Sequence, residues 1–331
     1  MIEHCSLLGR NTFGMDVKAE CLAEYSNIEE LRTLIAVSPK PLLAIGGGSN
    51  LLFLHDYSGT VLHSCINTIS EVGFDGNDVL VEVGSGVVWD DFVGWCVDHG
   101  FWGLENLTAI PGEVGASAIQ NVGAYGVEAG DRIEFVHAVS AEDGRERTFR
   151  RDECNYGYRH SIFKSELKGK YIVAHVTFRL STTPNPVLGY GTLREECEKM
   201  GGVTLENIRN AVRYIRDSKL PDPQVLGNAG SFFMNPIVDE SVYEELIKDY
   251  PNAPSYKLGN GKVKIPAGWL IEQCGWKGRS LGKAAVYDRQ ALVLVNKGGA
   301  TGEDIRHLAD TVIADVKSRF GIELKAEVNY I

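Results

Sequence analysis

Short apolar runs and alternation of apolar with polar residues dominate the first half of the chain, and both patterns are typical of β-strands. "GTVLHS", "DVLVEVGSG" and "RIEFVHAVSA" are of this kind, and turn signals such as "DGND" and "EDGR" separate them. "KYIVAHVTFRL" closes this part as a strongly β-prone segment. We therefore expect residues 1 to about 183 to form an α+β region in which strands predominate.

Apolar residues at helical spacing predict a second set of elements. "SNIEELRTLIAV" begins at a possible cap, Ser26 or Asn27, and "VWDDFVGWCVDHG" stops at Gly100. The helix "LENIRNAVRYIRDSK" must end near Lys219, because the prolines that follow cannot continue it. The rest of the chain predicts a connection with its own helix in "STTPNPVLGYGTLREECEKMGG" and helices in "SVYEELIKDY", "AGWLIEQCGW" and "GEDIRHLADTVIADVKSRFG". It also predicts a buried strand in "ALVLVN" and an extended end in "IELKAEVNYI".

Composition excludes several classes of protein. The chain has 331 residues, a net charge of −11 and an ordinary share of hydrophobic residues, which disfavours non-specific binding to nucleic acid or to an anionic membrane. We find no signal peptide and no membrane-spanning run, so we expect a cytoplasmic protein. The seven cysteines are scattered without a CxxC pair, and the histidines form no HExxH. We therefore expect neither a disulfide framework nor a metal site.

Two glycine-rich stretches carry the first indication of a ligand. "GGGSNL" at 46–51 follows a predicted buried strand, but Leu51 replaces the third glycine of a dinucleotide fingerprint. Taken alone, it is a tight turn between two strands. Residues 103–126, "GLENLTAIPGEVGASAIQNVGAYG", are too long for a hairpin loop and too rich in small residues for an amphipathic helix. Together, the two stretches favour backbone that lies against a large, flat, phosphorylated cofactor.

A third stretch, "GNAGSFFMNP" at 227–236, sets Ser231 between glycines and phenylalanines. The simpler interpretation is a strand that starts after a tight turn and sends its aromatic side chains into the core. The other is a reactive hydroxyl that a ligand can approach while the aromatic rings exclude water. The local sequence favours the first interpretation.

Seven motifs in fixed order resemble the UDP-N-acetylenolpyruvoylglucosamine reductase family of bacterial cell-wall synthesis, and the resemblance covers nearly the whole chain. They are "AIGGGSNLLF", "GLENLTAIPGEVGASAIQNVGAYG", "YGYRHSIFK", "SKLPDP", "GNAGSFFMNP", "AGWLIEQCGWKG" and "RQALVLVN". The resemblance implies a flavin-binding fold of the vanillyl-alcohol-oxidase (PCMH) type, with two FAD-binding subdomains at 1–67 and 68–215. An α+β substrate-binding domain would follow at 216–331.

The resemblance also implies FAD, held non-covalently because serine and asparagine, not histidine, follow the glycine turn. The residues that would contact FAD lie in the two glycine-rich stretches: Gly46, Gly47, Gly48, Ser49, Asn50, Leu51, Ile110, Pro111, Gly112, Ser117, Ile119, Gln120, Asn121, Gly123, Ala124, Tyr125 and Gly126. The implied reaction moves a hydride from NADPH to FAD and then to the enolpyruvyl group of the nucleotide sugar.

Three residues would carry the chemistry of that reaction. Arg159 would bind the substrate carboxylate with two parallel hydrogen bonds, Glu327 would lie protonated beside it, and Ser231 would protonate the enolate-like intermediate. The residues that would hold the UDP-sugar are Tyr190, Arg216, Lys219, Asn235, Tyr256 and Gln290. "LGYGTLREECEKMGG" resembles the tyrosine-bearing loop of the family's first type.

Two departures from the family pattern are visible: Met234 stands where lysine is usual, and "LKAEVN" stands where "LEPEVR" is usual. Two alternative functions remain at this point. One is another FAD oxidoreductase on the same fold, and the other is a non-catalytic flavin- or nucleotide-sugar-binding protein, which would be expected to lose the arginine, serine and glutamate. We expect a monomer whose partners are its substrate and NADPH.

Overall fold

The protein forms two compact units in a computed structural model that describes all 331 residues. Unit 1 comprises residues 1–6, 18–48 and 57–218, and unit 2 comprises residues 7–17, 49–56 and 219–331. The three-domain division with boundaries after residues 67 and 215 remains a prediction. No helix of the chain combines the length and apolar character that crossing a bilayer requires.

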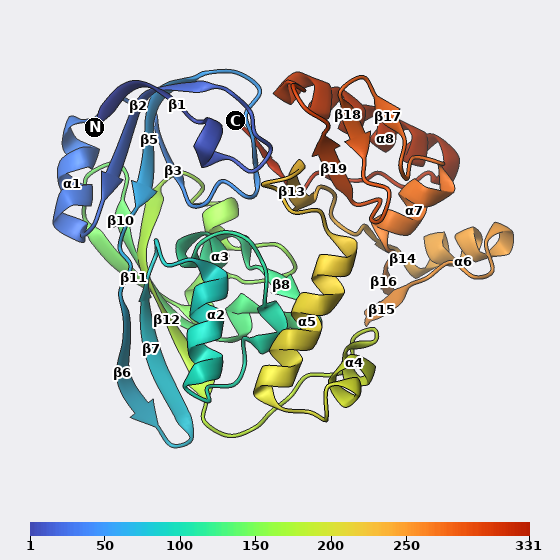
Figure 1. Cartoon of the computed structure of the whole chain (residues 1–331), viewed down its shortest axis with the longest axis horizontal. Coiled ribbons are helices and arrows are strands. Elements are labelled where there is room, and N and C mark those ends of the chain that lie inside the picture. The colour runs from blue at the N-terminus through green and yellow to red at the C-terminus, as the bar shows by residue number, and fades with distance from the viewer. The chain divides into compact units, whose positions relative to one another are not determined.

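Two sheets form the framework of unit 1 (Figure 1). A four-stranded sheet has the order β1 (Ile2–Ser6), β2 (Lys18–Tyr25), β5 (Tyr57–Ser64), β3 (Leu42–Ile45). An antiparallel five-stranded sheet has the order β11 (Glu146–Arg150), β10 (Ile133–Ser140), β12 (Tyr171–Ser181), β7 (Asp78–Gly84), β6 (Ile69–Asp75). In the first sheet β5 pairs in parallel with both β2 and β3, while β1 pairs antiparallel with β2.

Helix α1 (Ile28–Val37) covers one face of the four-stranded sheet. Its N-terminus is capped by the side chain of Asn27, which accepts a hydrogen bond from the Glu30 N–H, so of the two predicted caps Asn27 is the one used. Its buried residues Leu31 and Ile35 share one apolar cluster with residues of β2, β5, β10 and β12. The two sheets of unit 1 are therefore joined by a common core.

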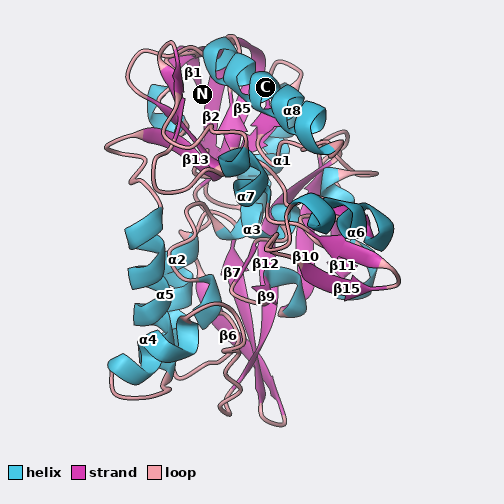
Figure 2. Cartoon of the chain, turned by 90° about the vertical axis from the view of Figure 1, so that its right-hand side faces the viewer, coloured by secondary structure: helices cyan, strands magenta, loops and turns pink.

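A second, larger core lies under α2 (Trp89–Asp98), where Trp89 and Phe92 are wholly buried against Phe178 of β12. Helix α5 (Leu205–Lys219) lies beside α2, as both views show (Figures 1 and 2). The carboxylate of Asp90 accepts hydrogen bonds from Arg209 and Arg213 of α5 and from the Ala109 N–H at 2.6 Å. One acidic side chain thus ties α2, α5 and the second glycine-rich stretch together.

The second glycine-rich stretch has more regular structure than its sequence predicts. It contains α3 (Val114–Gln120) and the small β8–β9 hairpin (Gly123–Ala124 and Val127–Glu128). The helix packs by means of small residues: a Cβ on Gly115 would lie 2.7 Å from the Ser85 Cβ. Its buried face consists of Val114 and the small residues Gly115, Ser117 and Ala118, so its amphipathic period is weak in the sequence.

Unit 2 is also built on sheets, but its strands are shorter. The antiparallel sheet has the order β13 (Gly227–Ser231), β19 (Val293–Asn296), β18 (Ala284–Val286), β17 (Ser280–Leu281). The smaller pairings are β14 (Ile237–Asp239), β16 (Lys262–Lys264), β15 (Tyr256–Gly259), and β20 (Asn329–Tyr330) with β4 (Leu51–Leu52). The pairing of β20 with β4 is parallel and brings residues 51–52 beside the C-terminal residues.

Helix α8 (Gly302–Phe320) packs on β18 and β19 of this sheet. Its buried residues recur at helical spacing, a capping box between Thr301 and Asp304 begins it, and Gly321 ends it in the left-handed conformation. The remaining helices are α4 (Leu193–Lys199), α6 (Glu240–Asp249) and α7 (Ala267–Gln273). The helices and longer strands predicted from sequence are confirmed, with α5 ending at Lys219 as expected.

We predict that Asp90→Asn lowers the free energy of unfolding by about 1.5–3 kcal/mol at pH 7, because the bonds it loses are made to a charged group. Burial alone would raise the pKa of Asp90, but the bonds from Ala109 and Arg213 and the charge of Arg209 outweigh it and lower that pKa. Since the folded pKa is lowered, the stabilisation is present above the ordinary value of about 3.9 and disappears as the pH falls through the folded pKa.

Denaturant unfolding at several pH values measures this effect. The matched control is Asp91→Asn, the exposed next residue of α2, which should change stability by less than about 0.5 kcal/mol. Equal stability of the two variants at pH 7 would contradict the role assigned to Asp90.

Candidate active site

The glycine turn 46–48 lies close to the second glycine-rich stretch within unit 1. A Cβ on Gly47 would stand 3.6 Å from the Gly112 Cα, and one on Gly46 would stand 3.2 Å from the Glu113 Oε2. Gly48 and Gly112 have φ of 65° and 120°, which other residues rarely adopt. Two backbone segments far apart in sequence thus come together with almost no side chains between them.

Unusual backbone conformations gather in this region. Ala109, Asn121, Tyr125 and Arg159 all have φ between 48° and 58° although none is glycine. Such conformations cost free energy and persist only where surrounding contacts enforce them, which is common at ligand sites. Ala109 has no polar side chain that could stabilise its left-handed conformation. It was not among the site residues predicted from the sequence.

The side chains and exposed backbone of the second glycine-rich stretch fit a flat ligand with polar edges. Gln120 has a buried Oε1 with no hydrogen-bond partner, an acceptor that a bound group could satisfy. Pro111 and Gly126 are exposed, and Ile110, Ile119 and Ala124 are partly exposed. These residues leave backbone and small side chains accessible beside the glycine turn, as FAD would require.

Two residues predicted to contact the cofactor have side chains that form hydrogen bonds within the protein. The Ser117 hydroxyl is buried and donates to the Val114 carbonyl of its own helix at 2.7 Å. The fully buried Asn121 donates to Glu128 and to the Gly157 carbonyl, and its Oδ1 accepts from the Gly130 N–H at 2.8 Å. These hydrogen bonds give both side chains a role in shaping the loop, and contact of either residue with FAD remains a prediction.

Unit 1 brings two arginines to the β8 hairpin. Arg159 donates from Nη2 to the Gly123 carbonyl at 2.8 Å, and a Cβ on Gly123 would lie 3.0 Å from its Nη1. Arg216 of α5 donates to the Ala109 carbonyl at 3.2 Å. Burial lowers the pKa of Arg216 and the nearby charge of Arg159 adds to this effect, while Tyr125, Asp217 and Asp90 oppose it. The two guanidiniums are thus near enough to interact, and an anion between them would relieve their repulsion.

Tyrosine side chains adjoin the same group. The rings of Tyr125 and Tyr190 meet edge to face, 5.7 Å between centroids, and Tyr190 is 42% exposed. The backbone of Tyr125 is held by Asn106, whose side-chain amide donates to its carbonyl at 2.8 Å. Of the residues predicted to bind substrate, unit 1 therefore gathers Tyr190 and Arg216 beside Arg159.

Ser231 ends strand β13 in unit 2, next to Gly230 with φ of 66°. Phe232 and Phe233 behind it are wholly buried and stack edge to face at 5.1 Å. The turn before Ser231 is fixed by Asn228, whose Oδ1 accepts from the Gly230 N–H and whose amide donates to the Pro221 carbonyl. The sequence analysis did not identify Asn228 as a functional residue, although an asparagine between two glycines is typical of a turn.

The segment after Ser231 pairs with the C-terminal segment that carries Glu327. The Glu327 N–H donates to the Phe232 carbonyl at 2.8 Å, and the Met234 N–H donates to the Lys325 carbonyl at 2.9 Å. Asn50 donates to the Glu327 carbonyl at 3.3 Å. Ser231, Asn50 and Glu327 therefore share one part of unit 2. Where Met234 replaces the usual lysine, the facing chain carries Lys325.

The other predicted substrate residues of unit 2 divide into two groups. Asn235 accepts a hydrogen bond from the Ala267 N–H at the start of α7, and Gln290 lies 3.1 Å from where a Cβ on Gly268 would be. Both therefore border α7. Lys219 is exposed at the end of α5, and Tyr256 lies on the exposed β15–β16 hairpin, with the Lys264 ammonium over its ring.

The remaining members of the predicted cofactor set, Ser49 and Leu51, follow the glycine turn and belong to unit 2 with Asn50. The boundary between the units passes between Gly48 and Ser49, inside "GGGSNL".

Two family models match the chain. One describes an FAD-binding domain and matches residues 19–150, and the other describes the C-terminal domain of UDP-N-acetylenolpyruvoylglucosamine reductase and matches residues 222–331. The first spans both glycine-rich stretches, and the second contains Ser231, Asn235 and Glu327.

Relatives match over their full length. A UDP-N-acetylenolpyruvoylglucosamine reductase of Bacteroides fragilis is 54% identical over 333 residues, 100% of each chain, and that of Porphyromonas gingivalis is 46% identical over 97% of this chain and 96% of its own. A crystal structure of the Thermus caldophilus reductase has the same fold, with a TM-score of 0.71, 24% identity and coverage of 100% and 98%. The chain belongs to the UDP-N-acetylenolpyruvoylglucosamine reductase family and has its flavin-binding fold with an additional α+β domain.

Proposed function

We propose that this protein reduces the enolpyruvyl group of UDP-N-acetylenolpyruvoylglucosamine, giving UDP-N-acetylmuramate for peptidoglycan, with bound FAD and with NADPH as the hydride source. Full-length relatives that carry this name, and the match of residues 19–150 to an FAD-binding domain, support the assignment. The reductive chemistry would be supplied by FAD, which accepts a hydride from a nicotinamide and delivers one to an activated double bond.

The glycine turn and the second glycine-rich stretch would hold the cofactor. Gly46, Gly47 and Gly112 have no side chain that would keep the cofactor from the backbone. The side-chain Oε1 of Gln120 would gain from the cofactor the hydrogen-bond partner that it lacks within the chain. Backbone N–H groups in turns of this kind bind phosphate without the help of lysine. No histidine follows the turn, and we expect the cofactor to be held without a covalent bond.

Arg159 would bind the carboxylate of the enolpyruvyl group. A guanidinium keeps its charge when it is desolvated and offers two parallel N–H groups, so it can stabilise charge that develops on that carboxylate. Its bond to the Gly123 carbonyl sets its direction before substrate arrives. Arg216, held by the Ala109 carbonyl, would add a second cationic contact for an anionic ligand.

Ser231 would deliver the proton that completes the reduction at carbon. The observation that carries this proposal is the pairing of the segment after Ser231 with the segment that carries Glu327, through the 2.8 Å bond from the Glu327 N–H to the Phe232 carbonyl. That pairing brings the backbone of the two segments together next to two buried phenylalanines, which supports a common role for Ser231 and Glu327. Tyr190, Lys219, Asn235, Tyr256 and Gln290 would hold the nucleotide sugar.

We predict that Gly47→Ala lowers FAD affinity by about 1–3 kcal/mol, the usual cost of forcing a methyl group into a filled site. The fold should tolerate the change, because the nearest protein atom to the new Cβ lies at an ordinary 3.6 Å. The ratio of flavin to protein after gel filtration measures the effect. Gly73→Ala in β6, with its nearest contact at 4.0 Å, is the control and should keep full occupancy.

Arg159→Lys should keep the charge but lower kcat by about 10²–10³-fold, the usual cost of removing one donor from an oxyanion site. An ammonium cannot reproduce the planar two-point contact. Steady-state turnover with the enolpyruvyl nucleotide measures it. Arg151→Lys is matched, since Arg151 also donates to a backbone carbonyl of unit 1, that of Gly130, and it should retain normal turnover. Normal turnover of Arg159→Lys would remove Arg159 from the carboxylate site.

Ser231→Ala should slow flavin reoxidation by substrate by about 10²–10⁴-fold, the usual contribution of a general acid. Reduction of the flavin by NADPH should stay within a few-fold of the original rate, because the hydroxyl has no part in it. Stopped-flow absorbance follows both steps in one sample. Ser280→Ala, in β17 of the same sheet, should leave both steps unchanged. Reoxidation at the original rate would show that Ser231 has only a structural role.

A further inference from the structure

A cluster of metal-ligand side chains lies on the four-stranded sheet of unit 1, outside the residues assigned to the reaction. Strands β2 and β5 are parallel neighbours, and their register places Glu24 opposite His63. Cys65 follows two residues after His63 and so points to the same side of the sheet. Its N–H donates to the Tyr25 carbonyl at 2.7 Å, which continues the pairing of the two strands beyond β5.

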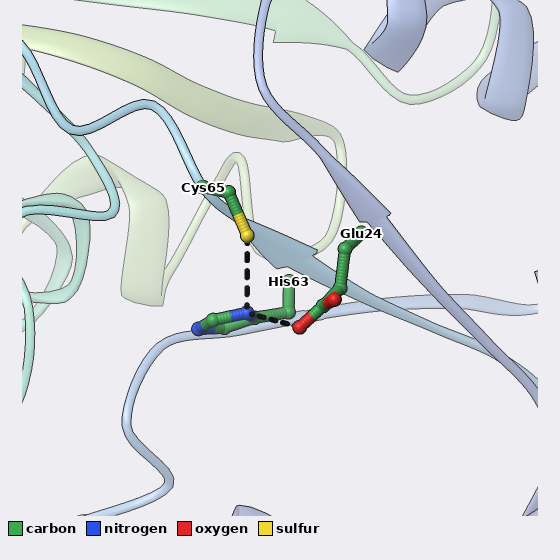
Figure 3. Close-up of side chains that lie close together, drawn as sticks. All are labelled: Glu24, His63 and Cys65. Carbon is green, nitrogen blue, oxygen red and sulfur yellow. Dashed lines mark hydrogen bonds and ion pairs between the residues drawn. The ribbon is translucent and has the colours of Figure 1, made fainter.

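The three side chains converge on one point (Figure 3). The His63 Nδ1 lies 3.3 Å from the Glu24 Oε1 and 3.9 Å from the Cys65 Sγ, and all three ligand atoms lie within 4.8 Å of one another. Bonds of about 2.0–2.3 Å from zinc at tetrahedral angles would separate such donors by roughly 3.3–3.8 Å. The spacing of the cluster is therefore close to that of a metal-bound set.

The other nitrogen of His63 is oriented as in a metal site. The Nε2 lies 2.9 Å from the Glu113 Oε1, and an ionised carboxylate can only accept, so the proton of this contact belongs to Nε2. In the neutral ring, Nδ1 then presents its lone pair to the Glu24 carboxylate. Two acceptors 3.3 Å apart repel, and either a bound cation or a second proton on the ring removes that repulsion. A histidine that binds a metal through one ring nitrogen commonly donates the N–H of the other to a carboxylate, which fixes the orientation of the ring.

We propose that Glu24, His63 and Cys65 bind a divalent cation of the zinc class, with Glu113 as the residue that positions His63. A mixed nitrogen, sulfur and oxygen donor set suits such a borderline-soft ion better than magnesium or calcium. The Glu24 side chain is 47% exposed, so an ion can enter from solvent and keep a water as its fourth ligand. Binding releases the thiol proton of Cys65 and forms a bond from sulfur to the metal.

The site also adjoins the glycine turn. The Glu113 Oε2 is buried without a hydrogen-bond partner and lies 3.2 Å from where a Cβ on Gly46 would be. A metal on His63 would therefore fix Glu113 in place beside Gly46. Motifs for metal sites rely on ligands that are close together along the chain. Glu24 lies on a different strand from His63 and Cys65, so no such motif predicts this cluster.

Equilibrium dialysis of the reduced, chelator-treated holoprotein against buffered Zn²⁺ tests the proposal, with bound metal measured by elemental mass spectrometry. We expect one Zn²⁺ per chain. Glu24→Gln and Cys65→Ser should each weaken binding at least tenfold, and Glu113→Gln should weaken it by about 10–100-fold. The matched controls are His137→Gln, which removes another histidine beside a carboxylate, and Cys274→Ser, which removes another partly exposed thiol. Both should bind as the original protein does.

Co²⁺ gives a second measurement that does not depend on affinity. The difference spectrum on adding Co²⁺ should contain a thiolate-to-metal charge-transfer band that disappears in Cys65→Ser and persists in Cys274→Ser. Zinc uptake that is the same in the original protein and in a Glu24→Gln, Cys65→Ser double variant would overturn the proposal. His63 would then be a doubly protonated ring between two carboxylates.

Discussion

The buried side chain of Asn121 holds together the loops on which the candidate site depends. Its amide and carbonyl groups bond to Glu128, Gly130 and Gly157, which belong to three successive parts of unit 1. Its own backbone is left-handed, a conformation that asparagine tolerates better than most residues. These bonds tie the loop that carries Arg159 to the β8–β9 region, and the bond from Arg159 to the Gly123 carbonyl adds a second link between them.

Electrostatics then determines what this loop arrangement can bind. Arg159 and Arg216 both bond to backbone carbonyls, of Gly123 and Ala109, and neither of these bonds neutralises a cationic charge. The protein has a net charge of −11, yet it places two guanidiniums where each affects the other. Two guanidiniums this close together can attract an anion such as a carboxylate or a phosphate in spite of the negative net charge of the protein.

Local sequence signals predicted the elements that depend on local interactions. The cap at Asn27, the end of α5 before Pro221 and the β-prone residues of β12 each depend on neighbouring residues, and each predicted element is confirmed. The motifs also located the glycine turn and Ser231. Long-range pairings were not predictable in this way. Helix α3 buries mostly small residues, and nothing in the sequence near Glu24 indicates that His63 will lie opposite it.

The same limit explains why the role of Asn50 could not be seen from its own neighbourhood. Gly48 belongs to unit 1 and Ser49 to unit 2, and the chain after the boundary forms β4, which pairs with β20 at the other end of the sequence. Asn50 donates to the Glu327 carbonyl and accepts, through its own carbonyl, from the Asn329 N–H. The glycines of the turn therefore belong to unit 1, and two residues further along the chain Asn50 bonds to the segment of unit 2 that carries Glu327. Because Asn50 bonds to the backbone of this segment, a change at Asn50 can alter the position of Glu327 without any contact with the Glu327 side chain.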